Sequence, residues 1–327
     1  MKTKAEQIEM LLRGEAPPAN AGIFGATLEE KDCKLIIIPV PWDGTASYGK
    51  GTALAPDAIR KASHQLDLED LFFDRPYQKG IRMLKIPEDI LLMNGLSSQR
   101  KLTPGEKCYR SRIINQYVYR QAKRLLAEGK IVGVLGGEHS VPLGLIDALE
   151  EKCSNFGILH IDAHHDLRAG YEGFDFSHAS IMYNVMETFP LLKLCQVGVR
   201  DFCAQERAYS NALGQRAKVF YWQNIFQKID EGISFRAIID EVSDFLPKKI
   251  YISFDIDGLD PSNCPNTGTP VPGGLSFSQA VYLIEGLSVN HKIIGFDLCE
   301  VAPGGGSDWD CNVGARVLYK LCGAALK

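Results

Sequence analysis

Three stretches of this chain each pass from an apolar segment into residues that bind divalent metal ions. The most complete is Ile158–Asp166, in which Asp162, His164 and Asp166 follow one another at two-residue spacing. Side chains two residues apart in an extended chain point the same way, so these three converge if the chain stays extended. Burying two carboxylates and an imidazole without a counter-charge is costly. The pattern therefore predicts metal ligands rather than a polar cluster in the core.

The other two stretches would complete a ligand set. Ile131–Ser140 ends in Gly-Gly-Glu-His-Ser, whose glycines allow a tight turn that lets His139 face a neighbouring strand. Ile250–Pro261 carries Asp255 and Asp257, which share one face by the same alternation. Each motif alone is weak evidence. Together they supply two imidazoles and four carboxylates, too many for one four-coordinate zinc and suited to two divalent ions that share ligands.

The histidines cluster around these motifs. Five of the seven fall within one forty-residue stretch, at positions 139, 160, 164, 165 and 178. We interpret His160, which lies deeper in the strand than Asp162, as a residue supporting the ligands or the core. His165 alternates away from the site, and we do not expect it to bind metal.

A fourth apolar segment ends in an acid. Gly295–Pro303 places Glu300 at the tip of a strand, with Asp297 two residues deeper. A buried acid beside a metal site needs a partner, and a guanidinium is the natural bidentate one. Glu300 is therefore a candidate for holding a guanidinium, with a structural salt bridge as the alternative. We expect Asp297 to support the site from behind.

The elements that must position these residues alternate between strands and helices. The apolar segments predict strands over 34–41, 81–86, 131–135, 156–161, 194–199, 217–221, 249–254 and 293–298. Helical periodicity lies over 4–13, 109–129, 142–152, 234–246, 277–288 and 312–323. Such alternation indicates a parallel sheet covered on both faces, with its site at the carboxyl ends of the strands. We expect an N-terminal arm of residues 1–30 and one catalytic domain of residues 31–327.

Composition excludes several classes of protein. The 327 residues are 45% hydrophobic and 23% charged, and the net charge of −4 argues against a nucleic-acid partner. Nine cysteines without a Cys-x-x-Cys pair favour reduced thiols in a cytoplasmic protein. We find no signal peptide and no apolar run of about 18 residues. We therefore expect a soluble cytoplasmic protein without a membrane partner.

The three metal motifs, in this order, resemble the signatures of the ureohydrolases, the family that contains arginases, agmatinases and formiminoglutamases. The resemblance runs from about residue 35 to the C-terminus. It implies a three-layer α/β/α sandwich with an eight-stranded, mainly parallel sheet, two Mn²⁺ ions, and a homo-oligomer, a trimer or hexamer. It also implies two overlapping ligand sets. These are His139, Asp162, Asp166 and Asp255 for one ion, and Asp162, His164, Asp255 and Asp257 for the other.

The resemblance implies roles for the residues around the metals. The reaction would be hydrolysis of a guanidino C–N bond with release of urea, by a metal-activated water. Asp166 would also accept a proton, and Glu300 would hold the guanidinium. His178 lies in Phe-Ser-His-Ala-Ser, similar to a segment of agmatinases. It would line the substrate channel and help to protonate the leaving amine with a pKa near neutrality.

Substrate choice should depend on the loop Leu167–His178. It lacks the Asn- and Ser/Thr-rich character of arginases and resembles agmatinases, so agmatine, hydrolysed to putrescine and urea, is the expected substrate. Glu172 and Asp175 could attract an amine tail, whereas Arg168 could equally bind a carboxylate, as on guanidinobutyrate. Another guanidino hydrolase is the nearest alternative. A single-zinc deacetylase of similar fold and a non-catalytic metal-binding protein fit the ligand set less well.

Two residues beside the site depart from common family patterns. His165 stands where a small or apolar residue is usual, and Cys299 precedes Glu300. Both bear on metal preference and substrate range.

Overall fold

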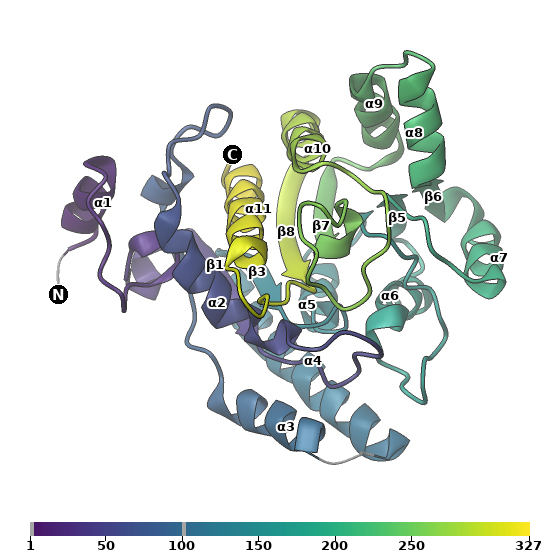
Figure 1. The fold of residues 1–327 in the computed structure, drawn as a ribbon, viewed down its shortest axis with the longest axis horizontal. Coiled ribbons are helices and arrows are strands. Elements are labelled where there is room, and N and C mark those ends of the chain that lie inside the picture. The colour runs from purple at the N-terminus through teal and green to yellow at the C-terminus, as the bar shows by residue number, and fades with distance from the viewer. Residues whose placement is uncertain (1–2, 100–102) are drawn as a thin grey trace.

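The computed structural model describes residues 3–99 and 103–327. Its centre is an eight-stranded sheet (Figure 1), and every pairing between described strands is parallel. The predicted α/β fold with a mainly parallel sheet is therefore confirmed. The strand order is β2-β1-β3-β8-β7-β4-β5-β6. The strands are β1 (Leu35–Val40), β2 (Ile81–Met83), β3 (Ile131–Gly136), β4 (Gly157–Ile161), β5 (Lys193–Val197), β6 (Ala217–Phe220), β7 (Lys249–Asp255) and β8 (Lys292–Cys299).

All eight predicted strands are present because each is an apolar run that a doubly covered sheet can bury. In β1 every residue is buried, and its side chains alternate between two separate cores. Leu35 and Ile37 pack into one core, and Ile36 and Ile38 into the other. A half-exposed sheet would have required polar residues at alternate positions.

Helices cover both faces of the sheet (Figure 1). They are α1 (Lys4–Leu12), α2 (Ala55–Ala62), α3 (Glu88–Gln99), α4 (Pro104–Ala127), α5 (Leu143–Lys152), α6 (Ile181–Thr188), α7 (Ala204–Ala212), α8 (Trp222–Asp230), α9 (Phe235–Phe245), α10 (Phe277–Asn290) and α11 (Trp309–Leu326). Core residues of α4, α5 and α6 pack on one face, and core residues of α2, α9, α10 and α11 pack on the other. The three layers are therefore those that the resemblance implies.

The helices differ in how clearly the sequence marks them. The helices predicted over 4–13, 109–129, 142–152, 234–246, 277–288 and 312–323 are all present, and α4 begins earlier, at a Thr103–Glu106 capping box. We did not anticipate α3, α7 and α8. They are short or have weakly periodic sequences, and tertiary packing decides such segments.

The first thirty residues contain two structurally different parts. None of the residues of α1 is buried, and Lys4 ties the helix to the core by donating a hydrogen bond to the Asp32 carbonyl at 2.6 Å. Ile23 and Phe24, by contrast, belong to the core, where Phe24 lies edge-on to Tyr319 at 4.9 Å. The boundary at residue 30 stays a prediction.

Candidate active site

The strand order explains why residues far apart in the sequence meet. Strands β3, β8, β7 and β4 are consecutive neighbours in the sheet. Their carboxyl ends lead into His139, Glu300, Asp255 and Asp162 respectively. Because all four strands run parallel, these ends lie along one edge of the sheet, where α/β folds bind ligands.

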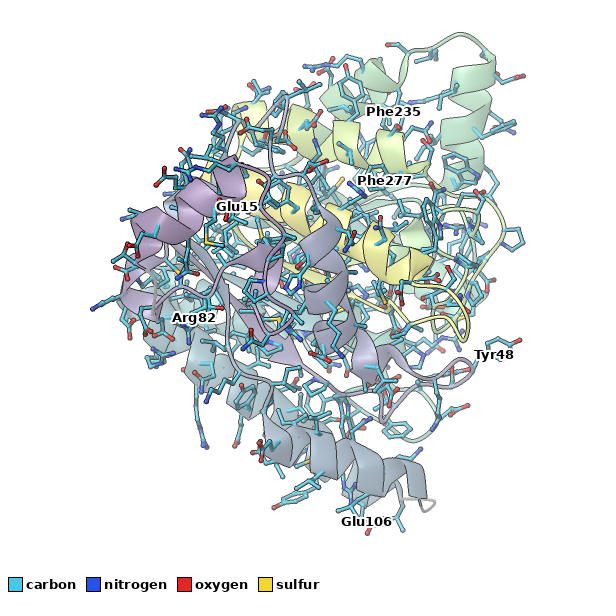
Figure 2. All side chains as sticks on the ribbon, turned by 60° about the vertical axis from the view of Figure 1, so that its left-hand side comes forward. Glu15, Tyr48, Arg82, Glu106, Phe235 and Phe277 are labelled. Carbon is cyan, nitrogen blue, oxygen red and sulfur yellow. The ribbon has the colours of Figure 1, made fainter. Side chains whose placement is uncertain are left out.

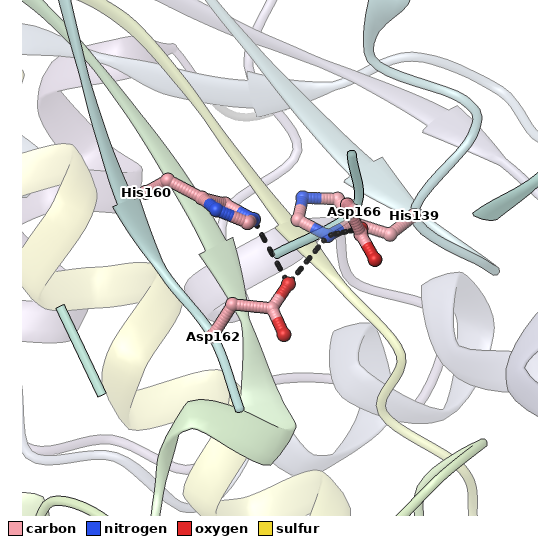
Figure 3. Close-up of side chains that lie close together, drawn as sticks. All are labelled: His139, His160, Asp162 and Asp166. Atoms are coloured by element: carbon pink, nitrogen blue, oxygen red, sulfur yellow. Dashed lines mark hydrogen bonds and ion pairs between the residues drawn. The ribbon is translucent and has the colours of Figure 1, made fainter. Parts of the chain in front are cut away.

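One group of side chains gathers around His139 (Figure 3). Its Nδ1 lies 3.1 Å from Asp162 Oδ2, 3.2 Å from Asp166 Oδ2 and 3.4 Å from Asp255 Oδ2. Three carboxylates thus face one ring nitrogen, and all four side chains are buried. These are the four residues of the first implied ligand set.

A second group gathers around His164. Its Nδ1 lies 3.1 Å from Asp257 Oδ2 and 3.4 Å from Asp162 Oδ1. Asp162 therefore presents one oxygen to each histidine, which is the arrangement that a bridging ligand needs. The structure brings all six predicted ligands together, Asp255 through its contact with His139, and groupings of these histidines and aspartates could bind metal ions.

The route by which Asp162, His164 and Asp166 converge differs from our expectation of an extended chain. Strand β4 ends at Ile161, and Asp166 has a left-handed backbone with φ of 53°. The carboxylate of Asp162 accepts a hydrogen bond from the His164 backbone N–H at 2.6 Å. Asp255 likewise accepts one from the Asp257 N–H at 2.8 Å, at the start of a 3₁₀ turn over Ile256–Gly258. Local turns closed by the ligands, rather than strand alternation, aim the side chains.

The two glycines before His139 serve close approach rather than an unusual turn. Neither Gly136 nor Gly137 has a positive φ. A Cβ on Gly137 would lie 1.9 Å from the Trp42 carbonyl oxygen, and one on Gly136 would lie 2.6 Å from Cys299 Sγ. The backbone after β3 therefore packs directly against its neighbours. Cys299 fills space between strands and does not line the cavity.

Residues behind the ligands hold their orientation. His139 Nε2 lies 2.8 Å from Ser253 Oγ and 3.4 Å from Asp297 Oδ1, and Tyr251 donates a 2.7 Å hydrogen bond to Asp297 Oδ2. Asp297 thus supports His139 from the side away from the carboxylates. Such partners fix the tautomer of a ligating histidine.

Gln196, which we did not anticipate, decides the roles of two histidines. Its amide NH₂ donates to the His165 carbonyl at 2.8 Å, which identifies that atom as the nitrogen. The same NH₂ donates to His160 Nδ1 at 2.8 Å, so the ring proton of His160 is on Nε2, 2.9 Å from Asp162 Oδ2. His160 therefore presents its Nε2 to Asp162 as a close contact. His165 Nδ1 pairs with the Gln196 oxygen at 2.7 Å and points away from the ligands.

The pKa shifts of these ligands indicate that the cluster would be stabilised by positive charge. Burial alone would lower the pKa of His139, but its contacts with Asp162, Asp166 and Asp255 hold that pKa well above its usual value. Burial, reinforced by the charge of Asp162, raises the pKa of Asp166 to about 6. Burial and the charges of Asp257 and Asp162 also raise the pKa of Asp255. Divalent cations would supply this positive charge, and they bind well to carboxylate and imidazole ligands.

Glu300 presents one free oxygen beside the cluster. Its Oε1 accepts a 2.9 Å hydrogen bond from the His139 backbone N–H, while its buried Oε2 has no hydrogen-bond partner in the described structure. Gly268 leaves room for this oxygen, because a Cβ there would lie 2.7 Å from Oε2. Glu300 also has a positive φ, of 64°. A buried carboxylate oxygen without a donor is a site for a cationic hydrogen-bond donor.

These groups form the floor of a cavity of about 380 Å³. Its lining includes His139, His164, Asp166, Arg168, His178, Asp255 and Glu300 from the predicted set. Tyr48, on the loop after β1, also lines the cavity and projects from the surface of the molecule (Figure 2). A larger groove, of about 910 Å³, lies between α2 and the start of α11 and is lined by none of the candidate ligands. The smaller cavity is therefore the candidate active site.

The substrate-loop residues lie in different places. Arg168 lines the cavity, stacks on the Tyr171 ring at 4.6 Å and lies 3.6 Å from Glu206. Glu172 and Asp175 are exposed and do not line the cavity. The structure therefore does not bring either of these acids to the place where we expected an amine tail.

His178 lines the cavity, but its expected pKa is wrong. Its Nδ1 lies 3.4 Å from Thr45 Oγ1, and its Nε2 lies 3.3 Å from Ser47 Oγ. Burial, followed by the positive charge of His164, lowers the pKa of His178 to about 4. The ring is therefore neutral at pH 7 and does not titrate near neutrality.

Glu138 is a further buried acid that we did not single out. It accepts hydrogen bonds from the Thr45 N–H at 2.8 Å, from Thr45 Oγ1 at 2.6 Å and from Ser140 Oγ at 2.7 Å. Thr45 Oγ1 in turn accepts a 3.1 Å hydrogen bond from the His178 backbone N–H. Glu138 thus anchors the loop at the cavity mouth. Its place inside the Gly-Gly-Glu-His motif was the available signal.

Comparison with known proteins identifies the class to which this fold and site belong. Residues 33–323 match the model of the Arginase family, and the chain belongs to that family. It is therefore a hydrolase of the ureohydrolase type, acting on a guanidino compound.

Its relatives are similar over most of their length. The chain is 32% identical over 277 residues to the N(1)-aminopropylagmatine ureohydrolase of Thermus thermophilus, covering 84% of this chain and 85% of that protein. It is 31% identical over 303 residues to the agmatinase of Pyrococcus horikoshii, covering 92% and 95%. The agmatine ureohydrolase of Thermoplasma volcanium superposes with a TM-score of 0.75 over 96% of both chains at 24% identity, which establishes the shared fold. No helix in the described ranges has the length and apolar character needed to cross a membrane.

Proposed function

We propose that this protein hydrolyses agmatine to putrescine and urea. The observation that carries the proposal is the unpartnered Oε2 of Glu300 beside the six metal-ligand candidates. A planar guanidinium is the donor that fits a carboxylate there. The agmatinase of Pyrococcus horikoshii supports the choice of substrate.

The six candidate ligands would hold two Mn²⁺ ions, His139, Asp162, Asp166 and Asp255 for one and Asp162, His164, Asp255 and Asp257 for the other. When bound, the ions would lower the pKa of a water molecule and make it nucleophilic at neutral pH. Asp166 would accept the proton that this water loses and pass it to the amine nitrogen as that nitrogen leaves. Neutral His178 would donate a hydrogen bond toward the leaving amine.

A second candidate substrate is N(1)-aminopropylagmatine, which the name of the Thermus thermophilus relative supports. It carries the same guanidino group on a longer amine chain. The cavity is open at its rim near Tyr48, which is 81% exposed, so a longer tail would extend into solvent.

The test is urea release by the manganese-loaded protein from agmatine, aminopropylagmatine, arginine, guanidinobutyrate and guanidine. We expect the amine-tailed compounds to be the best substrates. Glu300→Gln should retain its metal and weaken binding of the guanidino compound. No urea from any compound by a protein that holds two metal ions would overturn the proposal, and unchanged kinetics in Glu300→Gln would remove Glu300 from the site.

We also propose a cytoplasmic homo-oligomer, a trimer or hexamer. All nine cysteines are free in the structure, which supports a reducing compartment. The oligomer rests on the family resemblance, and light scattering on the purified protein would measure its mass. A monomer at working concentration would contradict this part of the proposal.

A further inference from the structure

Five acidic residues line the cavity: Asp166, Asp201, Glu206, Asp255 and Glu300. Asp166 and Asp255 face His139, and Glu300 faces the expected position of the guanidinium. That leaves Glu206 and Asp201 as the acids that could interact with the far end of a substrate.

Glu206 is already occupied by the protein. It is only 3% exposed and accepts hydrogen bonds from the backbone N–H of Leu167 at 3.3 Å and of Cys203 at 3.1 Å. Arg168 Nε lies 3.6 Å from its Oε2. This pairing also offsets the charge of Arg168, whose guanidinium is stacked on Tyr171. Arg168 is therefore poorly placed to bind a substrate carboxylate.

Asp201 has a fixed backbone and an exposed carboxylate. Its N–H donates to the Ala163 carbonyl at 3.1 Å, as does that of Arg200 at 2.8 Å. The Arg200 guanidinium is buried and donates to the Asp257 carbonyl at 2.7 Å. The Asp201 side chain is 69% exposed, and within the described residues its carboxylate accepts no hydrogen bond. The backbone of this acid is held firmly, and within the described residues the partner of its carboxylate is the His164 ring, 4.0 Å away.

Its position suits the tail of a substrate whose guanidino group is at the floor. His164 Nδ1 faces the ligand cluster, and its Nε2 lies 4.0 Å from Asp201 Oδ2. The His164 ring thus separates Asp201 from the other metal-ligand candidates. The neighbouring Phe202 lines the cavity and is fixed against His165 and Tyr221, with ring centroids 5.2 Å apart in each pair. It offers an apolar wall for the methylenes between the two charged ends.

We infer that Asp201 is the specificity residue of this site: its carboxylate binds the ammonium end of a guanidino substrate. The site would therefore take amine-tailed compounds and reject carboxylate-tailed ones. This inference rests on the proposed guanidino hydrolase activity. It also assigns to Asp201 the role that the sequence suggested for Glu172.

The test compares three guanidino compounds that differ at the tail: agmatine with an ammonium, butylguanidine with none, and guanidinobutyrate with a carboxylate. In Asp201→Asn we expect kcat/KM for agmatine to fall about 10-fold or more, the usual scale for losing a charged hydrogen bond. The value for butylguanidine should stay within about twofold, and that for guanidinobutyrate should rise. Metal content should not change. Asp201→Glu should recover part of the loss.

Two further measurements separate this role from a structural one. Because Asp201 is exposed, added salt should raise the wild-type KM for agmatine, and Asp201→Asn should lose most of this dependence. Glu172→Gln removes a competing acid outside the cavity. If Glu172→Gln rather than Asp201→Asn changes the ratio of agmatine to butylguanidine turnover, the inference is wrong.

The inference and the proposed function fail in different ways. Wild-type protein that releases no urea from any compound contradicts the function. In that case calorimetric binding of agmatine to the metal-loaded protein still decides the inference, since Asp201→Asn should weaken it. Wild-type protein that releases urea, with an Asp201→Asn variant of identical preference among the three tails, leaves the function standing and overturns the inference.

Discussion

At the scale of single residues, the site holds two of its chemical groups in uncommon backbone conformations. Asp166 and Glu300 have φ values of 53° and 64°. A non-glycine residue in this region costs about 1–3 kcal/mol, and persists only when surrounding contacts over-determine it. Here the contacts are backbone hydrogen bonds, from the Glu300 N–H to the Gly137 carbonyl at 2.8 Å and from the Tyr183 N–H to the Asp166 carbonyl at 3.1 Å. The fold therefore places these two carboxylates at the cost of unfavourable local backbone conformations.

Neutralising Asp162 or Asp255 should impair metal binding and activity more than neutralising any other residue of the site. Asp162 contacts both histidines, and Asp255 contacts His139. We expect Asp162→Asn or Asp255→Asn to lose bound metal and to reduce urea release at least about 100-fold, because each removes a bridging carboxylate. Elemental analysis and the urea assay measure the two effects. Asp240→Asn, an exposed acid on α9, is the control. Retained metal and activity in either bridging variant would refute the two-metal arrangement.

The lowered pKa of His178 makes a separate prediction about pH. With a pKa of about 4, the ring loses its proton well below neutrality, so it stays neutral throughout the range from about pH 6 to 9. We expect His178→Asn to lower kcat while the shape of the kcat–pH curve over that range stays the same. A limb near pH 6.5 in the wild type that disappears in the variant would show that His178 titrates there after all.

At the scale of elements, the loop Trp42–Gly51 depends on two buried acids. Asp43 Oδ2 accepts from the Gly51 N–H at 2.9 Å, and Glu138 accepts two hydrogen bonds from Thr45. The loop connects β1 to α2 and carries Ser47 and Tyr48 to the cavity. Its shape is thus set by contacts with the chain after β3 rather than by its own glycines alone.

We expect Thr45→Val to destabilise the protein by about 1–3 kcal/mol, because the hydroxyl's hydrogen bond to the buried Glu138 carboxyl and the one it accepts from the His178 N–H are both lost. Burial raises the pKa of Glu138 to about 7, and the bonds from Thr45 oppose that rise. The variant's pKa should therefore be higher still, so the loss of stability should grow as pH rises from 6 to 8, where the carboxylate is charged.

Urea denaturation at pH 6 and pH 8 measures this effect. Thr52→Val is the matched control, since the Thr52 hydroxyl is also buried but has no hydrogen-bond partner in the described structure. Equal loss of stability in the two variants, or a loss that shrinks with rising pH, would show that the Thr45–Glu138 contact does not anchor the loop.

At the scale of the whole molecule, the metal ligands join strands from the middle of the sheet. The ligand-bearing strands β3, β7 and β4 belong to its four central strands, and the buried acids at their ends lie against His139 and His164. Bound ions should therefore stabilise the fold as well as activate water.

Removing the metal should lower the thermal midpoint by several degrees, because the buried carboxylates then repel one another or must take up protons. Scanning calorimetry with and without a chelator measures the shift, and added Mn²⁺ should restore it. Asp162→Asn, which should hold little metal, ought to respond weakly to the chelator. An unchanged midpoint in protein shown to be metal-free would contradict this coupling.

Local patterns in the sequence determined much of this protein. Apolar runs marked all eight strands, because a strand buried on both faces must be apolar throughout. The acids and histidines after those runs marked one edge of the sheet, because parallel strands end together. The three motifs also pointed to the ureohydrolase class, which the match to the Arginase family confirmed.

Only the tertiary structure decided which acidic side chains accept hydrogen bonds from the protein and which do not. Glu172, Asp201 and Glu206 are all acids near the substrate loop, but among the described residues only Asp201 lines the cavity with a carboxylate that accepts no hydrogen bond. Likewise Gln196, from a different strand, sets the proton of His160. Both outcomes depend on partners distant in the chain, 36 positions for Gln196 and His160 and 39 for Leu167 and Glu206. Spacing along the sequence predicts the direction of nearby side chains, but not which distant residues they contact in the folded protein.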